Sequence, residues 1–446
     1  MMKKVLAVLL LAAMLLSITA CGKKNRPADM PAAEQNQGEN EEKDIPITWR
    51  ELSTDVTMET KQLTCKDGSV VTIGPLTYDE YSVNIGVSFK NNTKEERRAE
   101  ITTMAINDLM VHPGMAVWAM PGEETKDTVS IDRDELRMSG IFAVEKIDLM
   151  VETTNSQWEN EEVITAQLTT SAKPEKITDA YYKTIQSVEA QEELGLFLVD
   201  AVNERIGLGK DLYLESKAYV NMYGIEYLLL EVVNEGDKLR NLFYSTEQIN
   251  TMKAAEGLDC RIYPGAKAIV QLDLTNALPQ TKMKAFGMTE IYQVLFQTSV
   301  YDCDELGHVD WESADKAMEF TYQVPGVTVT APDMTGTVLH QQEGLRISYK
   351  APVVDDWGCT VIYMIYEADP ALRLNVEQDW DQEIQVDGAC DWSNLNTPGL
   401  MERAIDIQQL ELENLEAAAS VTFWLRIYAY AEDDTEGTPL KLTIPL

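Results

Sequence analysis

Cysteine and histidine are scarce in this sequence. The chain has six cysteines and three histidines among 446 residues, and no two cysteines have the CxxC spacing. Zinc knuckles and dithiol redox sites are built on that spacing, so neither is expected. The HExxH, GxSxG and Walker motifs are missing as well. No group of residues predicts a catalytic centre, and we expect a protein that is not an enzyme and has no metal or cofactor.

Basic residues are the second shortage. Lysine and arginine total 37 against 74 aspartates and glutamates, which gives a formal net charge of -37 at pH 7. A field of that sign repels phosphate backbones and anionic lipid surfaces, so nucleic acid is excluded as a partner. The acidity is interpreted first as a source of solubility, with binding of divalent cations or of a basic partner as the functional alternatives.

Long apolar runs are almost absent. The best internal one, Ile225–Val233, is strand-sized and contains two glutamates. The exception is Val5–Leu16, which follows Lys3 and Lys4 and is shorter than the about 20 residues that a membrane-spanning helix needs. This pattern predicts an export signal over residues 1–20.

The signal ends in "SITAC", where Ile18, Thr19, Ala20 and Cys21 match the lipobox of bacterial lipoproteins position by position. This resemblance implies that Cys21 becomes the first mature residue and carries a thioether-linked diacylglycerol. Each buried CH₂ then contributes about 0.8 kcal/mol to membrane binding. We therefore expect a lipid anchor at the extracytoplasmic face of the cell membrane. An ordinary secretory signal that happens to contain a cysteine is the alternative.

Residues 21–46 are rich in Gln, Asn, Glu, Ala and Pro and contain almost no large apolar residues. This composition predicts a disordered tether after the anchor.

Export permits disulfides, but the cysteines that remain are odd in number: Cys65, Cys260, Cys303, Cys359 and Cys390. Cys260 with Cys303, or Cys359 with Cys390, would each close a loop within one predicted domain. Sequence separation does not test the geometry that a disulfide needs, so both pairings stay open.

An internal repeat is the most informative feature of the chain. "VSFKNNTK" around Asn91 matches "LEVVNEGDK" around Asn234, and the period between these two residues is 143. An Ile-Asn pair, a Pro-Gly pair and a later glycine follow each asparagine. The matched positions are Ile106-Asn107 and Ile249-Asn250, then Pro121-Gly122 and Pro264-Gly265, then Gly140 and Gly287. Landmarks in register over this length predict a duplicated unit.

A third, more diverged copy begins at Thr360 with "TVIYMIYEADP" and continues through Pro398-Gly399 to "VTFWLRIYAY" from Val421. Its register slips, because Ile405 and Ile407 fall one place off the alternation that follows Pro-Gly in the other copies.

Each unit contains about seven short alternating strands, which are buried most compactly in a two-layer antiparallel sandwich. The arrangement resembles the uncharacterised immunoglobulin-like modules of Gram-positive lipoproteins. We predict an all-β chain of three tandem immunoglobulin-like sandwich domains, over residues 47–172, 173–325 and 326–446. The spacing of Tyr181, Ile185 and Val188 favours a short helix at the start of the second domain, although first strands are the alternative there. Residues 407–418 are predicted as a further helical turn.

Two segments are candidates for a binding site. Asp302, Asp304 and Gly307 fit the first, third and sixth positions of an EF-hand, but Leu306 and Ser313 replace two required ligands, which favours a solvated acidic loop. Trp380 and Trp392 lie in a polar, turn-rich stretch where an exposed ring would stack on a sugar or on a partner's side chain. Packing of these rings in the core is the alternative.

The favoured function is a membrane-anchored, extracytoplasmic binding, adhesion or spacer module with an unidentified protein or cell-wall glycan as partner. One alternative is the solute-binding lipoprotein of a transporter, which requires parallel α/β lobes. Another is carbohydrate binding through the C-terminal domain.

Overall fold

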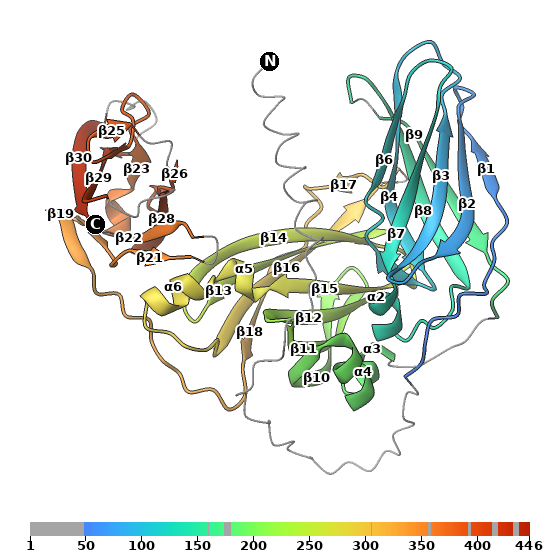
Figure 1. Cartoon of the computed structure of the whole chain (residues 1–446), viewed down its shortest axis with the longest axis horizontal. Coiled ribbons are helices and arrows are strands. Elements are labelled where there is room, and N and C mark those ends of the chain that lie inside the picture. The colour runs from blue at the N-terminus through green and yellow to red at the C-terminus, as the bar shows by residue number, and fades with distance from the viewer. Residues whose placement is uncertain are drawn as a thin grey trace. The chain divides into compact units, whose positions relative to one another are not determined.

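Antiparallel strands make up most of the chain in the computed structural model. The structure describes residues 49–446, except 159, 174–179, 305, 356–357, 391–393, 413–417 and 431–436. The predicted signal peptide, Cys21 and the predicted tether therefore lie outside the described residues. The prediction of an all-β, sandwich-type fold is confirmed, and the sheets are shown in Figure 1.

The first sandwich packs two sheets around a core of aliphatic residues. One sheet has the order β1 (Lys61–Thr64), β2 (Val70–Tyr78), β3 (Ser82–Lys90) and β7 (Glu124–Asp132). The other has the order β5 (Leu109–Val111), β4 (Arg97–Ile106), β8 (Lys146–Asn155) and β9 (Asn160–Thr169), with β6 (Met115–Ala119) also paired to β4. In β3 every second residue is buried, which is the period of a strand that covers a core with one face.

The second sandwich repeats this plan. One sheet has the order β10 (Leu196–Gly209), β11 (Leu212–Met222), β12 (Ile225–Asn234) and β15 (Lys267–Asp273). The other has the order β14 (Met252–Ile262), β13 (Arg240–Ile249), β16 (Gln293–Cys303) and β17 (Val309–Asp310), with β18 (Met318–Gln323) also paired to β16. The sequence IEYLLLEVV forms strand β12, as its length predicts.

One sheet continues from the first sandwich into the second. Lys267 of β15 pairs in parallel with Leu109 of β5, and the Lys267 N–H donates to the Asp108 carbonyl at 2.7 Å. Nine strands thereby form a single sheet across residue 172, where the sequence predicts a domain boundary. The sequence pattern did not predict this continuity.

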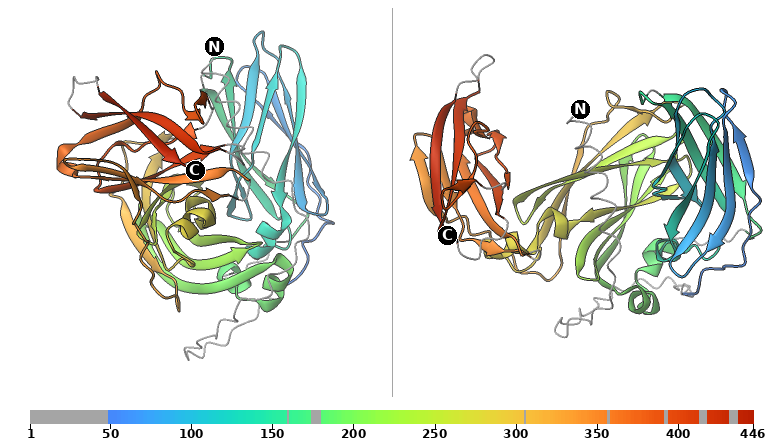
Figure 2. Two further views of the ribbon diagram at one scale, coloured as in Figure 1. Left: turned by 60° about the vertical axis from the view of Figure 1, so that its left-hand side comes forward. Right: turned by 45° about the horizontal axis from the view of Figure 1, so that its top comes forward.

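The third sandwich has six strands in each sheet, and Figure 2 shows them in orange to red. One sheet has the order β19 (Thr337–Gln342), β20 (Leu345–Tyr349), β22 (Thr360–Ala368), β28 (Ile405–Leu412) and β26 (Asn394–Leu395), with β21 (Val353–Val354) paired to β22. The other has the order β25 (Ala389–Cys390), β24 (Gln385–Val386), β29 (Ser420–Ala429), β23 (Leu374–Gln378) and β27 (Gly399–Leu400), with β30 (Thr438–Pro445) paired to β29.

The predicted repeat is visible as matching strands. Strands β3, β4 and β7 begin at residues 82, 97 and 124, and β12, β13 and β15 begin at 225, 240 and 267, which keeps the period of 143. The Ile-Asn landmarks are tight turns, with φ of 49° at Asn107 and 51° at Asn250. Asparagine tolerates this left-handed backbone better than most residues.

The third sandwich keeps the same strand order. The neighbours β11-β12-β15 of the second sandwich correspond to β20-β22-β28, and β13-β16-β18 correspond to β23-β29-β30. Its β23 has only five residues where β13 has ten, so the chain leaves the sheet early at this point.

The described helices are all short: α2 (Arg133–Met138), α3 (Ala180–Thr184), α4 (Val188–Leu194), α5 (Leu274–Ala277), α6 (Gln280–Ala285) and the 3₁₀ helix η1 (Pro370–Leu372). None in the described ranges has the length and apolarity to cross a membrane. The predicted helix before the second sandwich is present as α3 and α4, with Tyr181 and Ile185 buried and Val188 exposed.

The predicted helical turn over 407–418 is wrong for the part that the structure describes. Residues 407–412 belong to β28, because Leu410 and Leu412 are buried while Glu411 between them is exposed, which is the alternation of a strand. Residues 413–417 lie outside the described ranges.

Candidate functional site: exposed aromatic rings

Trp380, one of the two predicted binding residues, is highly exposed. Its side chain has 77% of its surface accessible, so the alternative of core packing is excluded for this ring. Trp380 lies in a turn closed by a hydrogen bond of 3.1 Å from the Gln382 N–H to the Asp379 carbonyl. Trp392, the second predicted residue, lies outside the described residues.

Arg426 holds the Trp380 turn in place through bonds to the residues on both sides of the tryptophan. Arg426 of β29 donates from Nε to Asp379 at 2.9 Å and also bonds to Asp381 on the other side of the tryptophan. Asp379 is only 2% exposed, and its N–H donates to the Trp424 carbonyl at 2.9 Å. The hydrogen bond to Asp379 is the largest cause that raises the pKa of Arg426. These bonds fix the backbone on both sides of Trp380, so its exposed ring is held on an ordered turn.

A second exposed group, which we call the Arg98 cluster, consists of Arg98, Trp118 and Trp158 on the first sandwich. The two tryptophan rings meet edge to face with centroids 5.2 Å apart. The Arg98 guanidinium lies 4.9 Å from the Trp158 ring centroid and 5.8 Å from that of Trp118. Trp158 is 63% exposed and Trp118 is 36% exposed, so the cluster presents aromatic surface to solvent.

Sheet pairing builds the Arg98 cluster. Strand β4 lies between β6 and β8, and Arg98 faces Trp118 on one side and Thr154 on the other. The turn after β8 then brings Trp158 over the guanidinium. We missed this site because the tryptophans are far apart in the sequence. One feature of the sequence could have indicated the site: Trp118 lies between two apolar residues of an alternating strand, which places its ring on the exposed face.

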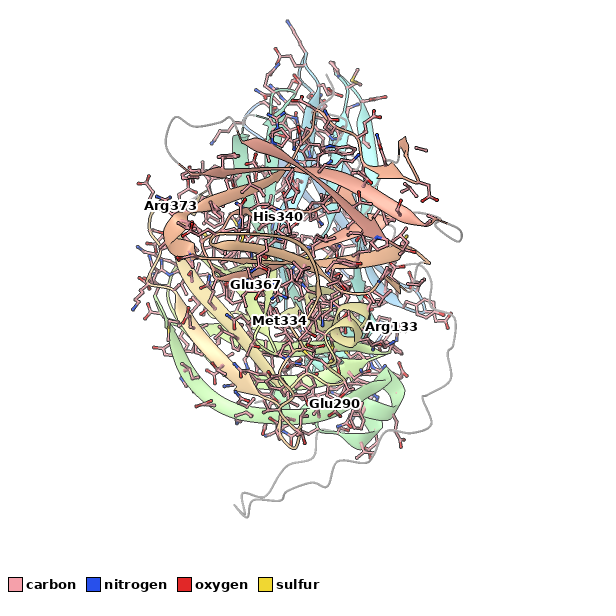
Figure 3. All side chains as sticks on the ribbon, turned by 90° about the vertical axis from the view of Figure 1, so that its left-hand side faces the viewer. Arg133, Glu290, Met334, His340, Glu367 and Arg373 are labelled. Atoms are coloured by element: carbon pink, nitrogen blue, oxygen red, sulfur yellow. The ribbon has the colours of Figure 1, made fainter. Side chains whose placement is uncertain are left out.

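An exposed ring follows the equivalent strand in each of the three sandwiches, three residues after β8, eight residues after β16 and one residue after β29. Trp158 follows β8, Trp311 follows β16 and β17, and Tyr430 follows β29, and these rings are 63%, 58% and 49% exposed. Each has a neighbour that supports it. Trp311 meets Tyr301 at 5.0 Å between centroids, and the Arg373 guanidinium, labelled in Figure 3, lies 5.2 Å from the Tyr430 ring centroid.

The acidic segment from Asp302 is held by cations and by its own backbone. Lys210 donates to Asp302 at 2.7 Å, and Arg240 pairs with the same carboxylate. Asp304 accepts from the N–H groups of Leu306 and His308. Within the described ranges no group of three or more His, Cys, Asp or Glu side chains is placed to hold a metal ion.

The structure decides one of the two open disulfide pairings. Cys260 on β14 and Cys303 on β16 are free, because β13 lies between their strands. Two strand spacings amount to about 10 Å, whereas the Cα atoms of a disulfide lie within about 7 Å of each other. The Cys359–Cys390 pairing stays open, because the Cys390 side chain lies outside the described residues.

Comparisons with known proteins give no family for this chain. No family model matches it, and no curated protein matches it. It is similar to a structure from a study of host cell surface retention of a 1.5-MDa bacterial ice-binding adhesin, at 12% identity over 81% of this chain and 88% of that chain, with a TM-score of 0.15. It is also similar to a calcium-binding mutant of Bacteroides uniformis beta-glucuronidase 2, at 10% identity over 60% and 28%, with a TM-score of 0.14. At these TM-scores neither likeness identifies a fold or a function.

Proposed function

We propose that this chain is a membrane-anchored, extracytoplasmic binding protein without enzymatic activity, and that it holds a neutral glycan against its exposed aromatic rings. The observation that carries the proposal is the recurrence of an exposed ring after three equivalent strands, as Trp158, Trp311 and Tyr430. A repeated unit that presents an exposed aromatic ring beyond the same strand of each copy favours binding to a repetitive partner.

The chemistry of these rings favours a sugar. Tryptophan and tyrosine offer a flat apolar face and one polar group, which match the C–H face and the hydroxyls of a sugar ring. Rings of this size are usually buried, so their exposure on supported positions points to a contact surface. The formal charge of -37 repels anionic polymers and leaves neutral glycans as the favoured partner.

Retention on insoluble polysaccharide tests the binding proposal. The mature chain, made soluble by Cys21→Ser, is incubated with insoluble chitin, a neutral glycan, and the bound fraction is measured. Loss of an aromatic contact residue often costs tenfold or more in affinity, so we expect roughly tenfold weaker retention of Trp158→Ala and Trp311→Ala. Retention of both variants at the level of the parent protein would contradict the proposal.

Tyr81→Ala is the matched control. Tyr81 is 70% exposed but lies at the opposite end of the first sandwich, beside Ser82, which pairs with Asp132. The Arg98 cluster lies at the other end, where Arg97 pairs with Asn155. Removal of the Tyr81 ring is expected to leave retention unchanged.

The anchor and the absence of enzymatic activity need their own tests. Mass spectrometry of the native protein is expected to find a diacylglycerol on Cys21, and Cys21→Ser is expected to release the protein into the medium. A bare thiol in the native host would contradict the anchor. Soluble products released from any incubated polysaccharide would contradict the non-enzymatic part.

A second candidate is carbohydrate binding at Trp380, supported by its 77% exposure on a braced turn. Trp380→Ala in the same retention assay tests it, and full retention would remove the idea. The solute-binding alternative is not favoured, because every pairing among the described strands is antiparallel except that of β15 with β5.

A further inference from the structure

A helix of the second sandwich packs against the third. Helix α6 and Phe286, which ends it, lie against one face of β22, beside β21 (Figure 1). The Phe286 and Tyr363 rings meet edge to face with centroids 5.9 Å apart, and the Thr281 and Tyr363 hydroxyls are 3.0 Å apart. Phe286 is fully buried and Tyr363 is 2% exposed. The contact is therefore closely packed and contains a hydrogen bond between two hydroxyls.

Strand β22 has two apolar faces, and each belongs to a different core. One face packs in the core of the third sandwich itself and consists of Ile362, Met364 and Tyr366. The residues that alternate with them belong to the core cluster of the second sandwich and are Val361, Tyr363 and Ile365. An antiparallel sheet with one face in water has polar residues on that face. The second face of β22 is instead built to be covered by the second sandwich.

Two ion pairs accompany this contact. Lys253 of β14 lies 3.4 Å from Asp406 of β28, which is 7% exposed. Lys350 Nζ lies 3.1 Å from Asp333 and 5.0 Å from the Phe286 ring centroid. The Asp333 N–H in turn donates to the Phe286 carbonyl at 2.8 Å. Complementary charges at fixed positions select one arrangement of two surfaces, which apolar burial alone does not.

The first sandwich uses its equivalent helix in the same way. Helix α2 follows β7 as α5 and α6 follow β15, and a landmark glycine of the repeat, Gly140 or Gly287, comes two residues after α2 or α6. Met138 of α2 belongs to one buried cluster with Leu229 of β12 and with residues of α3, α4 and β11. A Cβ at Gly140 would lie 2.4 Å from that of Ala180, so only glycine allows this close approach. Strands β12 and β22 hold the same place in the strand order, so both helices pack on equivalent strands.

The equivalent face of β3 in the first sandwich has a different composition. Over the period of 143, Tyr227 and Leu229 of β12 correspond to Asn84 and Gly86 of β3. Leu229 is fully buried, whereas Asn84 and Gly86 are partly exposed. Repeat proteins bury apolar faces between neighbouring units and keep polar residues on faces in water. The apolar residues of β12 and β22 therefore mark contacts between specific units.

We propose that the helix after β7 or β15 is a coupling element, which fixes each sandwich to the next in one arrangement. Linked domains move relative to one another by default, unless their interface is extensive and hydrophobic. The apolar second face of β22, together with the two ion pairs, opposes such motion. The coupling concerns how the copies are joined, so it goes beyond the function proposed above and does not depend on it.

Small-angle X-ray scattering of the full mature chain, made soluble by Cys21→Ser, tests the coupling of the second sandwich to the third. The parent is expected to fit one arrangement of these two sandwiches. Phe286→Ala and Tyr363→Ala each remove the central ring contact, so both are expected to raise the radius of gyration as the third sandwich is released. Residues 21–48 are common to all variants, so a difference between variants reports on the joint.

Circular dichroism shows whether each variant keeps its sheets. Tyr363 lies outside the core of the third sandwich itself, so Tyr363→Ala is expected to remain folded. If Phe286→Ala loses its sheet signal, Tyr363→Ala alone decides the test.

Phe296→Ala is the matched control. Phe296 is 1% exposed in the core of the second sandwich and stacks on Phe320 with centroids 5.1 Å apart. Its loss weakens that sandwich but keeps the contact between Phe286 and Tyr363, so the radius of gyration is expected to equal that of the parent. Equal radii for Tyr363→Ala and the parent, a rise that Phe296→Ala shares, or parent scattering that requires several arrangements of the two sandwiches would overturn the proposal.

Discussion

Asn91 and Asn234 make the same two hydrogen bonds at positions 143 residues apart. Each Nδ2 group donates to the carbonyl four residues later, at 2.7 Å and 2.8 Å, and to a carbonyl 28 residues later, at 2.8 Å and 2.9 Å. The main-chain carbonyl of each asparagine then accepts from the glycine of the Pro-Gly pair, Gly122 or Gly265. The asparagine and the Pro-Gly landmark of the repeat are therefore parts of one hydrogen-bonded unit.

Asn91→Ala and Asn234→Ala are each expected to lower the free energy of unfolding. Both side chains are fully buried, and truncation removes the two hydrogen bonds that each Nδ2 group donates. An unsatisfied buried polar group costs about 1–3 kcal/mol, which sets the expected loss. Urea denaturation measures it. Asn203→Ala, at an exposed position of β10, is the control and is expected to stay within about 0.5 kcal/mol of the parent.

The repeat was predictable because its landmarks have local causes. Asn107 and Asn250 lie in tight turns that need a left-handed residue, and each side chain accepts from two N–H groups at the start of β8 or of β16. Few residue types are tolerated at such positions, so the same residue recurs in both copies and the repeat can be recognised in the sequence. The alternation of apolar residues along the strands predicted the sandwich for the same reason, and in β3 every second residue is buried.

The Arg98 cluster and the shared sheet were not predictable from these patterns. Trp118 and Trp158 meet only because both flank β4, and pairing between distant strands leaves no local mark. The continuous sheet depends on one parallel pair, Lys267 with Leu109. The sequence pattern around each of these residues is that of a strand in its own sandwich, so it does not indicate that the two strands pair. Trp380 was identified because its surroundings are polar and turn-rich.

Arg426→Met is expected to destabilise the third sandwich. Asp379 is a buried carboxylate, and Arg426 is the cation that neutralises it. Because a third of the Arg426 side chain is exposed, solvent offsets part of the loss, and we expect a lower free energy of unfolding in urea denaturation. Arg403→Met, at an exposed position before β28, is the control. An unfolding free energy equal to that of the parent would show that the brace contributes nothing.

The thiols of Cys65 and Cys260 are expected to be unreactive in the folded protein at pH 8. Burial raises the pKa of both groups to about 12, so the reactive thiolate is rare at that pH. Ellman's reagent should titrate them only after denaturation. The assay on Cys65→Ser and Cys260→Ser variants assigns the signal. A disulfide between Cys260 and Cys303, seen as a linked peptide under non-reducing conditions, would contradict the strand order at β13.

Glu135 is expected to make the protein less stable as the pH rises from about 4 to 7. Desolvation, and then the neighbouring Asp132 charge, raise its pKa to about 7 in the folded state. The unfolded side chain titrates near about 4.3, so the folded state binds more protons over this interval. A folded state with the higher pKa loses stability as the pH passes from the unfolded to the folded value.

Glu135→Gln is therefore expected to reduce the fall in unfolding free energy between pH 5 and pH 8. Urea denaturation at the two pH values, on the variant and the parent, gives this difference, and groups that titrate in both proteins cancel. Glu192→Gln, at an exposed position of α4, is the control and should keep the pH dependence of the parent. An identical fall in the Glu135→Gln variant and the parent would mean that this carboxyl ionises in the folded protein as easily as in the unfolded chain, and that its surroundings near Asp132 remain hydrated.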